Sequence, residues 1–214
     1  MKKLVDAGTD VNTVYARGWT ALMAASFNRH DDIVMYLLQK KANPNLQNIA
    51  GWTALIYAAD REAVTIVAAL IQAKADVKLL ENQKNGALMY AVAKKNVPIV
   101  EMLLKAGADP NTQGEYYDEK PWTPLLQACN QGDEATALLL LEAGADPNLR
   151  SASDMTPLMW ASNQGFLGVV KVLVEEKKAD VNYQSKPQPT TALLQAVFKG
   201  QDQQPVAALL HFTS

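Results

Sequence analysis

The chain has 214 residues, 49% of them hydrophobic and 20% charged, so it contains enough apolar material to fold and is not a disordered polypeptide. Its 20 Lys and Arg against 22 Asp and Glu give a net charge of -2, which provides no overall attraction to nucleic acid or to anionic membranes. One cysteine and two histidines are too few for a zinc site of the usual kind, and no apolar run approaches the roughly 18 residues of a membrane span.

The first residues do not form a targeting signal. Met1-Lys-Lys-Leu4 has the charge of a secretory leader, but Asp6 and Asp10 interrupt it before an apolar stretch can form. We therefore expect no nucleic-acid partner, no membrane insertion, no metal and no cofactor. The compartment stays unknown, with the cytoplasm as the default expectation.

One phrase recurs along the whole chain. Gly18-Trp-Thr-Ala-Leu returns as Gly51-Trp-Thr-Ala-Leu, and altered forms of it follow four more times. The first position of its Thr-x-Leu core falls at residues 20, 53, 86, 123, 156 and 191, a base period of 33 with insertions of four and two residues. A second phrase, Asp10-Val-Asn at its first occurrence and Asp180-Val-Asn at its last, keeps the same period. Such self-similarity indicates a solenoid whose repeats stack on their neighbours.

The two phrases resemble the ankyrin repeat, in which Thr-Pro-Leu-His opens the unit and Gly-Ala-Asp-x-Asn closes it. The resemblance covers the whole chain and implies an all-α ankyrin-repeat solenoid, a curved stack in which each 33-residue repeat contributes a β-turn and an antiparallel helix pair. It predicts a single domain over residues 1–214. The expected parts are a partial repeat at 1–17, full repeats at 18–50, 51–83, 84–120, 121–153 and 154–188, and an incomplete repeat at 189–214.

The start of each first helix is marked by a capping residue. Thr is a good N-cap, and Pro at the first helical position loses no hydrogen bond. The N-cap candidates are Thr20, Thr53, Thr123, Thr156 and Thr191, and the prolines are Pro124 and Pro157. Second helices are expected at the apolar i, i+3, i+4 stripes of 33–38, 66–71, 99–104 and 169–174.

Several positions depart from the family pattern. Where the family has a His that ties neighbouring repeats together, this chain has apolar residues, which we expect to form an apolar ladder instead. These residues are Met23, Ile56, Met89, Leu126, Met159 and Leu194. Lys41 and Lys74 stand where Gly107 and Gly144 end other second helices in the left-handed conformation, and Gly86 replaces a capping Thr. We therefore expect residues 74–86 to be the softest internal junction.

The ends of the array are expected to be incomplete. Aligned on the repeat, Met1 falls inside a second helix, and the last unit stops before a closing hairpin. This predicts either a piece of a longer protein or an end at which Leu4 and Val5 are covered by another chain. Self-association through the uncapped ends is a third hypothesis.

The resemblance also implies where a partner would bind. In ankyrin arrays the hairpin tips and the exposed side of the first helices form a concave surface, and the residue before the capping Thr is exposed and makes contacts. In this chain Trp19, Trp52, Trp122 and Met155 are among the residues at that position. Two interpretations stay open: the indoles form a ladder of solvent-facing anchors, or they brace the array by packing over neighbouring hairpins.

Further candidates lie along the first helices and in one insertion. Tyr57, Tyr90 and Trp160 are placed on the groove floor, where partial burial with one edge available to a ligand is the favoured interpretation. Phe27, Arg61, Gln131 and Gln164 precede the turns to the second helices, and the amides among them suit recognition of an extended backbone. Tyr116 and Tyr117 lie at the tip of the four-residue insertion, which predicts either a contact finger or a tolerated loop.

No pattern for catalysis occurs in the sequence. Nucleophile-elbow, P-loop, dinucleotide and zincin motifs are absent, and Cys129 falls on a first helix where other repeats have small residues. We therefore expect a non-enzymatic module that binds a partner protein or peptide. The alternative is a regulatory or targeting ankyrin segment of a larger enzyme or channel whose catalytic part lies outside this chain.

Overall fold

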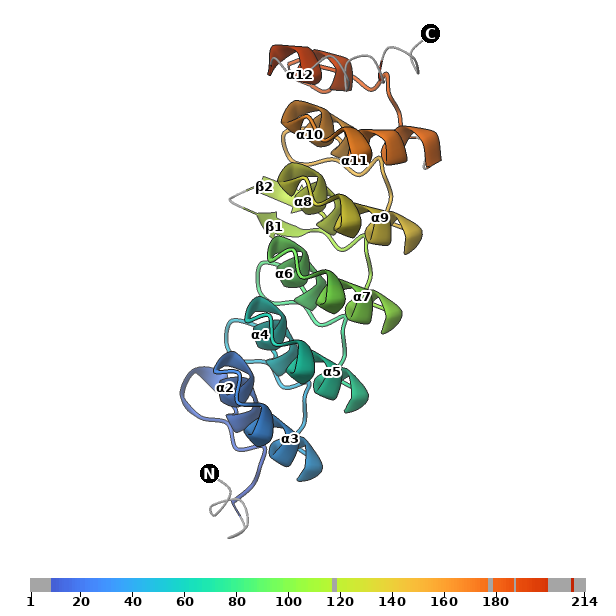
Figure 1. Cartoon of the computed structure of the whole chain (residues 1–214). Coiled ribbons are helices and arrows are strands. Elements are labelled where there is room, and N and C mark those ends of the chain that lie inside the picture. The colour runs from blue at the N-terminus through green and yellow to red at the C-terminus, as the bar shows by residue number, and fades with distance from the viewer. Residues whose placement is uncertain (1–8, 117–118, 177–178, 187, 200–208, 210–214) are drawn as a thin grey trace. The chain divides into compact units, whose positions relative to one another are not determined.

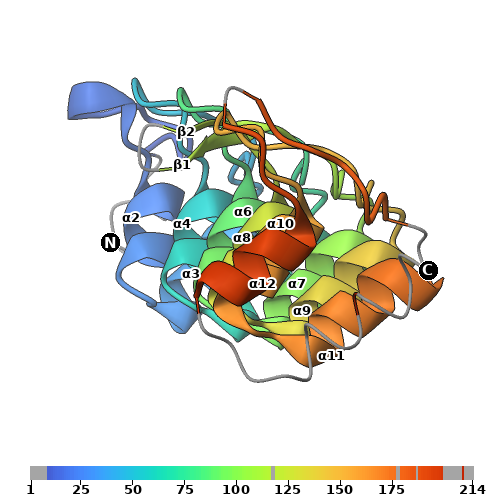
Figure 2. The same cartoon turned by 90° about the horizontal axis from the view of Figure 1, so that it is seen from above.

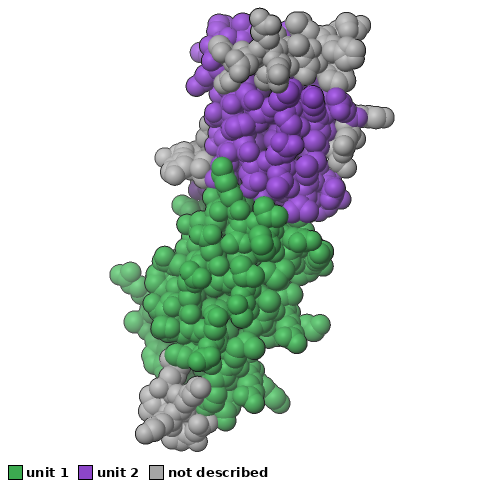
Figure 3. Space-filling view, in the orientation of Figure 1, with its two compact units in different colours: residues 1–109 green, residues 110–214 purple. Residues whose placement is uncertain are grey.

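The computed structural model describes residues 9–116, 119–176, 179–186, 188–199 and 209. Its backbone contacts divide the chain into two compact units, Met1–Asp109 and Pro110–Ser214 (Figure 3). The boundary falls inside the expected repeat 84–120, and the single-domain prediction and the repeat boundaries stay predictions. The expected half repeat at the N-terminus and the unclosed last repeat lie largely outside the described residues.

The described part of unit 1, residues 9–109, contains three antiparallel helix pairs. The first helices α2, α4 and α6 pack on one another in one layer, and α3, α5 and α7 pack on one another in a second (Figures 1 and 2). A short turn of 3₁₀ type, Ala16–Gly18, precedes the first pair. The helices are α2 (Ala21–Phe27), α3 (Asp31–Gln39), α4 (Ala54–Asp60), α5 (Val64–Gln72), α6 (Ala87–Ala93) and α7 (Val97–Lys105).

In the described part of unit 2, two antiparallel helix pairs and the helix α12 follow the same plan, and a two-stranded sheet precedes the first helix. The strands are antiparallel, with Gly114 opposite Trp122 and Tyr116 opposite Glu119, and α10 packs between α8 and α12. The elements are β1 (Gly114–Tyr116), β2 (Glu119–Trp122), α8 (Pro124–Gln131), α9 (Glu134–Glu142), α10 (Pro157–Gln164), α11 (Leu167–Lys171), a π-helical turn (Val172–Glu176) and α12 (Ala192–Phe198).

The predicted helix starts are confirmed. Thr20 Oγ1 accepts a hydrogen bond from the Met23 N–H at 3.2 Å, and Thr53 Oγ1 accepts one from Ile56 at 3.1 Å. The other three capping threonines do the same in unit 2. Gly86 makes no side-chain cap for α6, as its lack of a hydroxyl predicts. A threonine cap contributes about 1 kcal/mol, so the sequence defines these boundaries locally.

The cores of both units lie between the helix layers. Five of the six apolar residues that replace the family His are buried, at 5% exposure or less, whereas Leu194 on α12 is 42% exposed. The predicted left-handed ends are also present, because φ is 63° at Lys41, 65° at Lys74 and 91° at Gly107. A lysine in this conformation costs about 1 kcal/mol relative to glycine.

Candidate partner-binding surface

Unit 1 carries a continuous stack of aromatic side chains, which we call the aromatic row. Tyr57 on α4 lies between two indoles: its ring centroid is 4.7 Å from that of Trp19 and 4.7 Å from that of Trp52. Trp52 then contacts Tyr90 on α6, again at 4.7 Å. Phe27, at the end of α2, meets both Trp19 and Tyr57 edge to face, at 5.8 and 5.5 Å. Five of the residues that the sequence proposed separately therefore form one surface.

The row forms because the repeat places equivalent residues side by side. Trp19 and Trp52 each precede the Thr that caps a first helix. Tyr57 lies one turn into α4, and Tyr90 lies one turn into α6. Stacked α2, α4 and α6 bring these positions into register. Tyr57 is 8% exposed, whereas Trp19, Trp52, Phe27 and Tyr90 are only partly buried. The row thus combines a packed floor with aromatic area that solvent reaches, which fits the favoured interpretation of the tyrosines.

Polar residues of the hairpins hold the tyrosines in place. Asn48, itself buried, donates from Nδ2 to the Tyr57 hydroxyl at 2.8 Å and accepts at Oδ1 from the Ala50 and Trp52 N–H groups. Burial raises the pKa of the Tyr57 hydroxyl. It also raises the pKa of Tyr90, helped by the negative charges of Glu81 and Asp60. Both phenols are therefore neutral at physiological pH.

A cationic edge lies beside the row at the ends of the first helices. The Arg61 guanidinium sits over the Phe27 ring, 3.9 Å from its centroid, a cation–π arrangement. Asp60 lies between Arg61, at 3.6 Å, and Lys94, at 3.3 Å. One carboxylate thus serves two cations that are each about two-fifths exposed. The charges of Arg61, Lys94 and Asp60 sum to +1.

Trp122 does not face solvent, and that expectation is wrong. Its ring is 1% exposed, and its indole N–H donates to Gln127 Oε1 at 2.8 Å. The hairpin β1–β2 ends on Trp122 and places it directly before α8, where it meets Trp160 edge to face at 5.4 Å. The insertion before α8 therefore changes the setting of this position, and the bracing interpretation holds for Trp122.

Amide side chains at the ends of the first helices of unit 2 bond to one another across neighbouring repeats. Gln164 Nε2 donates to Asn130 Oδ1 at 3.4 Å, and Asn163 Nδ2 donates to Gln195 Oε1 at 2.6 Å. Gln131 is partly buried at the end of α8. These amides link the ends of neighbouring first helices, which reduces the number of donors and acceptors left for a partner. Their role in recognition stays a prediction.

The remaining candidates lie on the hairpins of unit 2. Tyr116 belongs by its backbone to β1, and Tyr117 lies outside the described residues. Met155 is partly buried, and its carbonyl accepts from the Ser151 N–H at 3.0 Å. The structure thus pairs strands on either side of the insertion's tip, with a register shift between Gly114 and Tyr116, while a contact there stays a prediction.

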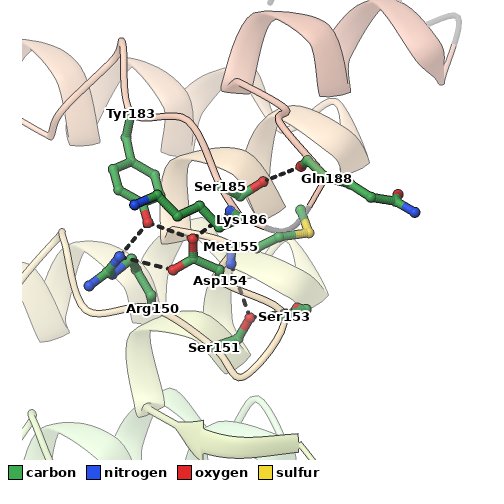
Figure 4. Close-up of polar contacts among 9 residues, drawn as sticks. All are labelled: Arg150, Ser151, Ser153, Asp154, Met155, Tyr183, Ser185, Lys186 and Gln188. Carbon is green, nitrogen blue, oxygen red and sulfur yellow. Dashed lines mark hydrogen bonds and ion pairs between the residues drawn. The ribbon is translucent and has the colours of Figure 1, made fainter.

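Sequence reasoning missed an ionic cluster that joins two hairpins of unit 2 (Figure 4). Asp154 accepts from Arg150 Nη1 at 2.9 Å, from the Tyr183 hydroxyl at 2.7 Å and from the Lys186 N–H at 2.7 Å. Arg150 also donates to the Tyr183 hydroxyl. The Tyr183 hydrogen bond, with the Lys186 N–H and Arg150 adding to it, holds the pKa of Asp154 below its usual value. No motif marks these residues, although their hairpins are one repeat apart.

A second missed group lies at the hairpin bases. Asn48, Glu81, Ser151 and Ser185 are all buried and occupy matching places in their repeats. Glu81 accepts from the Gln83 and Asn85 N–H groups, at 2.9 and 3.1 Å, much as Asn48 does one repeat earlier. The spacing of 33 residues between Asn48 and Glu81 was the available signal. Because the side chains at this position differ in type, the pattern becomes visible only in the folded structure.

In the described part of the chain, the possible metal ligands, the helices and Cys129 bear on chemistry and on membrane insertion. Within them no group of three His, Cys, Asp or Glu residues is placed to hold a metal ion, and no helix is long and apolar enough to cross a membrane. Cys129 is fully buried on α8, and burial raises the pKa of its thiol, which disfavours the reactive thiolate.

Comparison with known proteins agrees with the architecture. The family described as "Ankyrin repeats (3 copies)" matches at residues 1–81, 40–114, 88–185 and 125–212. The chain is also similar in structure to the human ASB11 ankyrin repeat domain, with a TM-score of 0.78 and 24% identity over all of this chain and 91% of that one. At that identity the likeness shows the fold alone.

Two curated proteins match a shorter stretch. The mitochondrial disaggregase of Bos taurus is 48% identical over 46 residues, and that of Homo sapiens is 46% identical over 46 residues. The matched stretch is 22% of this chain but only 7% and 6% of those proteins. The similarity therefore concerns a small part of each relative.

Proposed function

The chain belongs to the ankyrin-repeat family, and from this premise we propose that it binds a partner protein through the aromatic row of unit 1. Ankyrin repeats generally serve protein–protein interaction, and the finer assignment concerns the surface. The observation that carries it is the stack of Trp19, Tyr57 and Trp52, whose indoles remain only partly buried. Trp, Tyr and Arg dominate the energetically important positions of protein interfaces.

Unit 2 supports the assignment by contrast. Its equivalent indole, Trp122, is fully buried and has its N–H satisfied, so it has no ring surface to offer a partner. Its amides bond one another across neighbouring helices. Among the residues that the structure describes, unit 1 combines the partly buried indoles of the row with the cationic edge of Arg61 and Lys94.

The test compares partner capture by immobilised wild-type protein and by a Trp19→Ala/Trp52→Ala variant, using extract from the cells that produce the chain. We expect the variant to lose the proteins that the wild type retains, because the substitutions remove the indole surface that solvent reaches. Phe198→Ala is the matched control, because Phe198 is 79% exposed but lies outside the row. Retention of the same proteins by both variants contradicts the proposal.

A second pair of variants separates binding from folding. Arg61→Gln and Lys94→Gln remove charge from the edge of the row and leave its aromatic rings in place, although Arg61→Gln also removes the guanidinium over Phe27. The circular dichroism of the helices and the melting temperature should therefore change little, least of all in Lys94→Gln. Weaker capture by these variants supports a surface role. A large loss of melting temperature in the Trp variant, with normal capture by the charge variants, identifies the indoles as braces.

The alternative of an ankyrin segment within a larger enzyme is the second candidate. It is favoured by the matches to the disaggregases, in which the similar stretch is a small share of a much longer protein. The size of the native product, read by immunoblot with an antibody against this chain, tests it directly. A product of about 23 kDa contradicts the alternative.

A further inference from the structure

We propose that the aromatic row of unit 1 recognises a proline-rich segment in the polyproline II conformation that carries acidic residues at every third position. The proposal rests on the function proposed above and names the chemistry of the partner. It follows from the spacing of the row, from its unused hydrogen-bond donors and from the charge at its edge.

The spacing sets the conformation of the partner. Trp19 and Trp52 each lie 4.7 Å from Tyr57, so their ring centroids are separated by no more than twice that distance. The same bound applies to Tyr57 and Tyr90 on either side of Trp52. The helices α2 and α4 pack together, and packed helices lie about 8–10 Å apart. One repeat of the row therefore advances by about 8–9 Å.

Only one extended conformation matches this advance. A polyproline II helix presents the same face after three residues, or about 9 Å. A β-strand does so after about 6.7 Å, and an α-helix after one turn of about 5.4 Å or after two turns of about 10.8 Å. Three residues of a polyproline II segment thus span about the same distance as one repeat of the row, so every third residue can contact the equivalent place in successive repeats.

The row also offers hydrogen-bond donors, which a polyproline II segment needs for its carbonyl groups. A polyproline II chain makes no internal hydrogen bonds, so its carbonyl groups need donors from outside. Neither the Trp19 nor the Trp52 indole N–H has a hydrogen-bond partner among the residues that the structure describes, and both side chains are partly buried. The Trp122 N–H, by contrast, is already bonded to Gln127. Aromatic surfaces with such donors accept proline rings, which lose little conformational freedom on binding.

Charge complementarity places acids on the segment. The ends of the first helices of unit 1 and the turns after them carry four cations, Arg29, Arg61, Lys94 and Lys95, against the two carboxylates Asp60 and Glu62. Arg61 and Lys94 occupy the same place in successive repeats and both approach Asp60. An acidic residue at every third position would meet one cation per repeat while its neighbouring prolines lie on the rings.

The probe is a capped peptide of three consecutive Pro-Pro-Glu units, and the control is a peptide of the same composition with its three glutamates adjacent at one end. Binding to the whole chain is measured by tryptophan fluorescence and calorimetry at low salt. We expect the periodic peptide to bind at least about tenfold more tightly than the control, because only its acids keep step with the repeat. Equal affinity of the two peptides, or no binding at about 1 mM, overturns the proposal.

Variants test the donors and the charges separately. Trp19→Phe/Trp52→Phe keeps aromatic rings in the stack but removes both N–H groups, and should weaken the periodic peptide by about three- to tenfold. Arg61→Gln/Lys94→Gln should abolish most of the preference for periodic acids. Lys105→Gln is the control, since Lys105 is an exposed lysine on α7 that pairs with Glu101. Unchanged peptide affinity in both double variants overturns the assignment.

The outcome also separates this inference from the proposed function. If the Trp19→Ala/Trp52→Ala variant loses its cellular partners while the periodic peptide fails to bind the wild type, the row is an interface but its partner is not a polyproline II segment. If the peptide binds the row and the captured proteins lack proline-rich acidic stretches, the inference about the natural partner is overturned.

Discussion

Replacing Trp122 by Phe should destabilise unit 2 by far more than the same change at Trp52. Trp122 is fully buried, and its N–H satisfies Gln127 Oε1, while Gln127 is itself 0% exposed. The Gln127 Nε2 group already lacks a partner among the described residues. Loss of the indole N–H leaves a second buried polar atom unpaired, which costs about 1–3 kcal/mol. The smaller ring removes about two carbons of packing, or about 1–2 kcal/mol more.

The expected decrease in the free energy of unfolding is therefore about 2–5 kcal/mol for Trp122→Phe. Trp52→Phe is the control and should cost less than about 1.5 kcal/mol, because Trp52 is only partly buried and its N–H has no bonding partner among the described residues. Both are read from urea unfolding followed by circular dichroism. Adding Gln127→Leu to Trp122→Phe should recover about 1–3 kcal/mol, because it removes the stranded amide. Simple additivity of the two losses refutes the reasoning.

Three further changes test other parts of the structure. Asp154→Asn should lower the free energy of unfolding by about 1–3 kcal/mol at neutral pH. Because the Tyr183 hydrogen bond lowers the pKa of Asp154, this difference is present above the unfolded pKa of about 3.9 and disappears as the pH falls through the lower folded pKa. A series of urea unfolding curves from pH 7 to pH 3 measures the difference. Gly107→Ala should lower the free energy of unfolding by about 1 kcal/mol in urea. The cause is backbone strain alone, since φ is 91° and no heavy atom lies within 4 Å of the added Cβ. Lys74→Gly, at a φ of 65°, should raise the free energy of unfolding. Cys129 should react with a thiol reagent at pH 8 only after urea unfolds the chain, because burial both shields the thiol and raises its pKa, and rapid labelling of the native protein would contradict this.

The proposed binding surface was only partly visible in the sequence. The repeat placed Trp19, Trp52 and Trp122 at one register, but Trp19 and Trp52 are partly buried against Tyr57 whereas Trp122 is fully buried. The reason is the insertion before α8, which forms the β1–β2 hairpin and ends on Trp122. A four-residue change in loop length is easily counted, whereas its effect on a neighbouring side chain depends on the path that the backbone takes.

The sequence by itself determined the repeat, the helix starts and the left-handed helix ends, because each of these depends on residues a few positions apart. A threonine hydroxyl bonds an N–H three residues later, and a stripe of apolar residues at helical spacing selects one buried face. Such interactions are set by local geometry and can be read without knowing the neighbours.

Only the tertiary structure decided which side chains share a surface. The contact of Trp52 with Tyr90 and the bond from Tyr183 to Asp154 join neighbouring repeats, and a period gives the register of such residues but not the direction or depth of their side chains. Burial of Trp122 and exposure of the indoles in unit 1 follow from how the helices and hairpins pack. That packing minimises apolar exposure over many residues at once, so it cannot be assigned to any single position in the sequence.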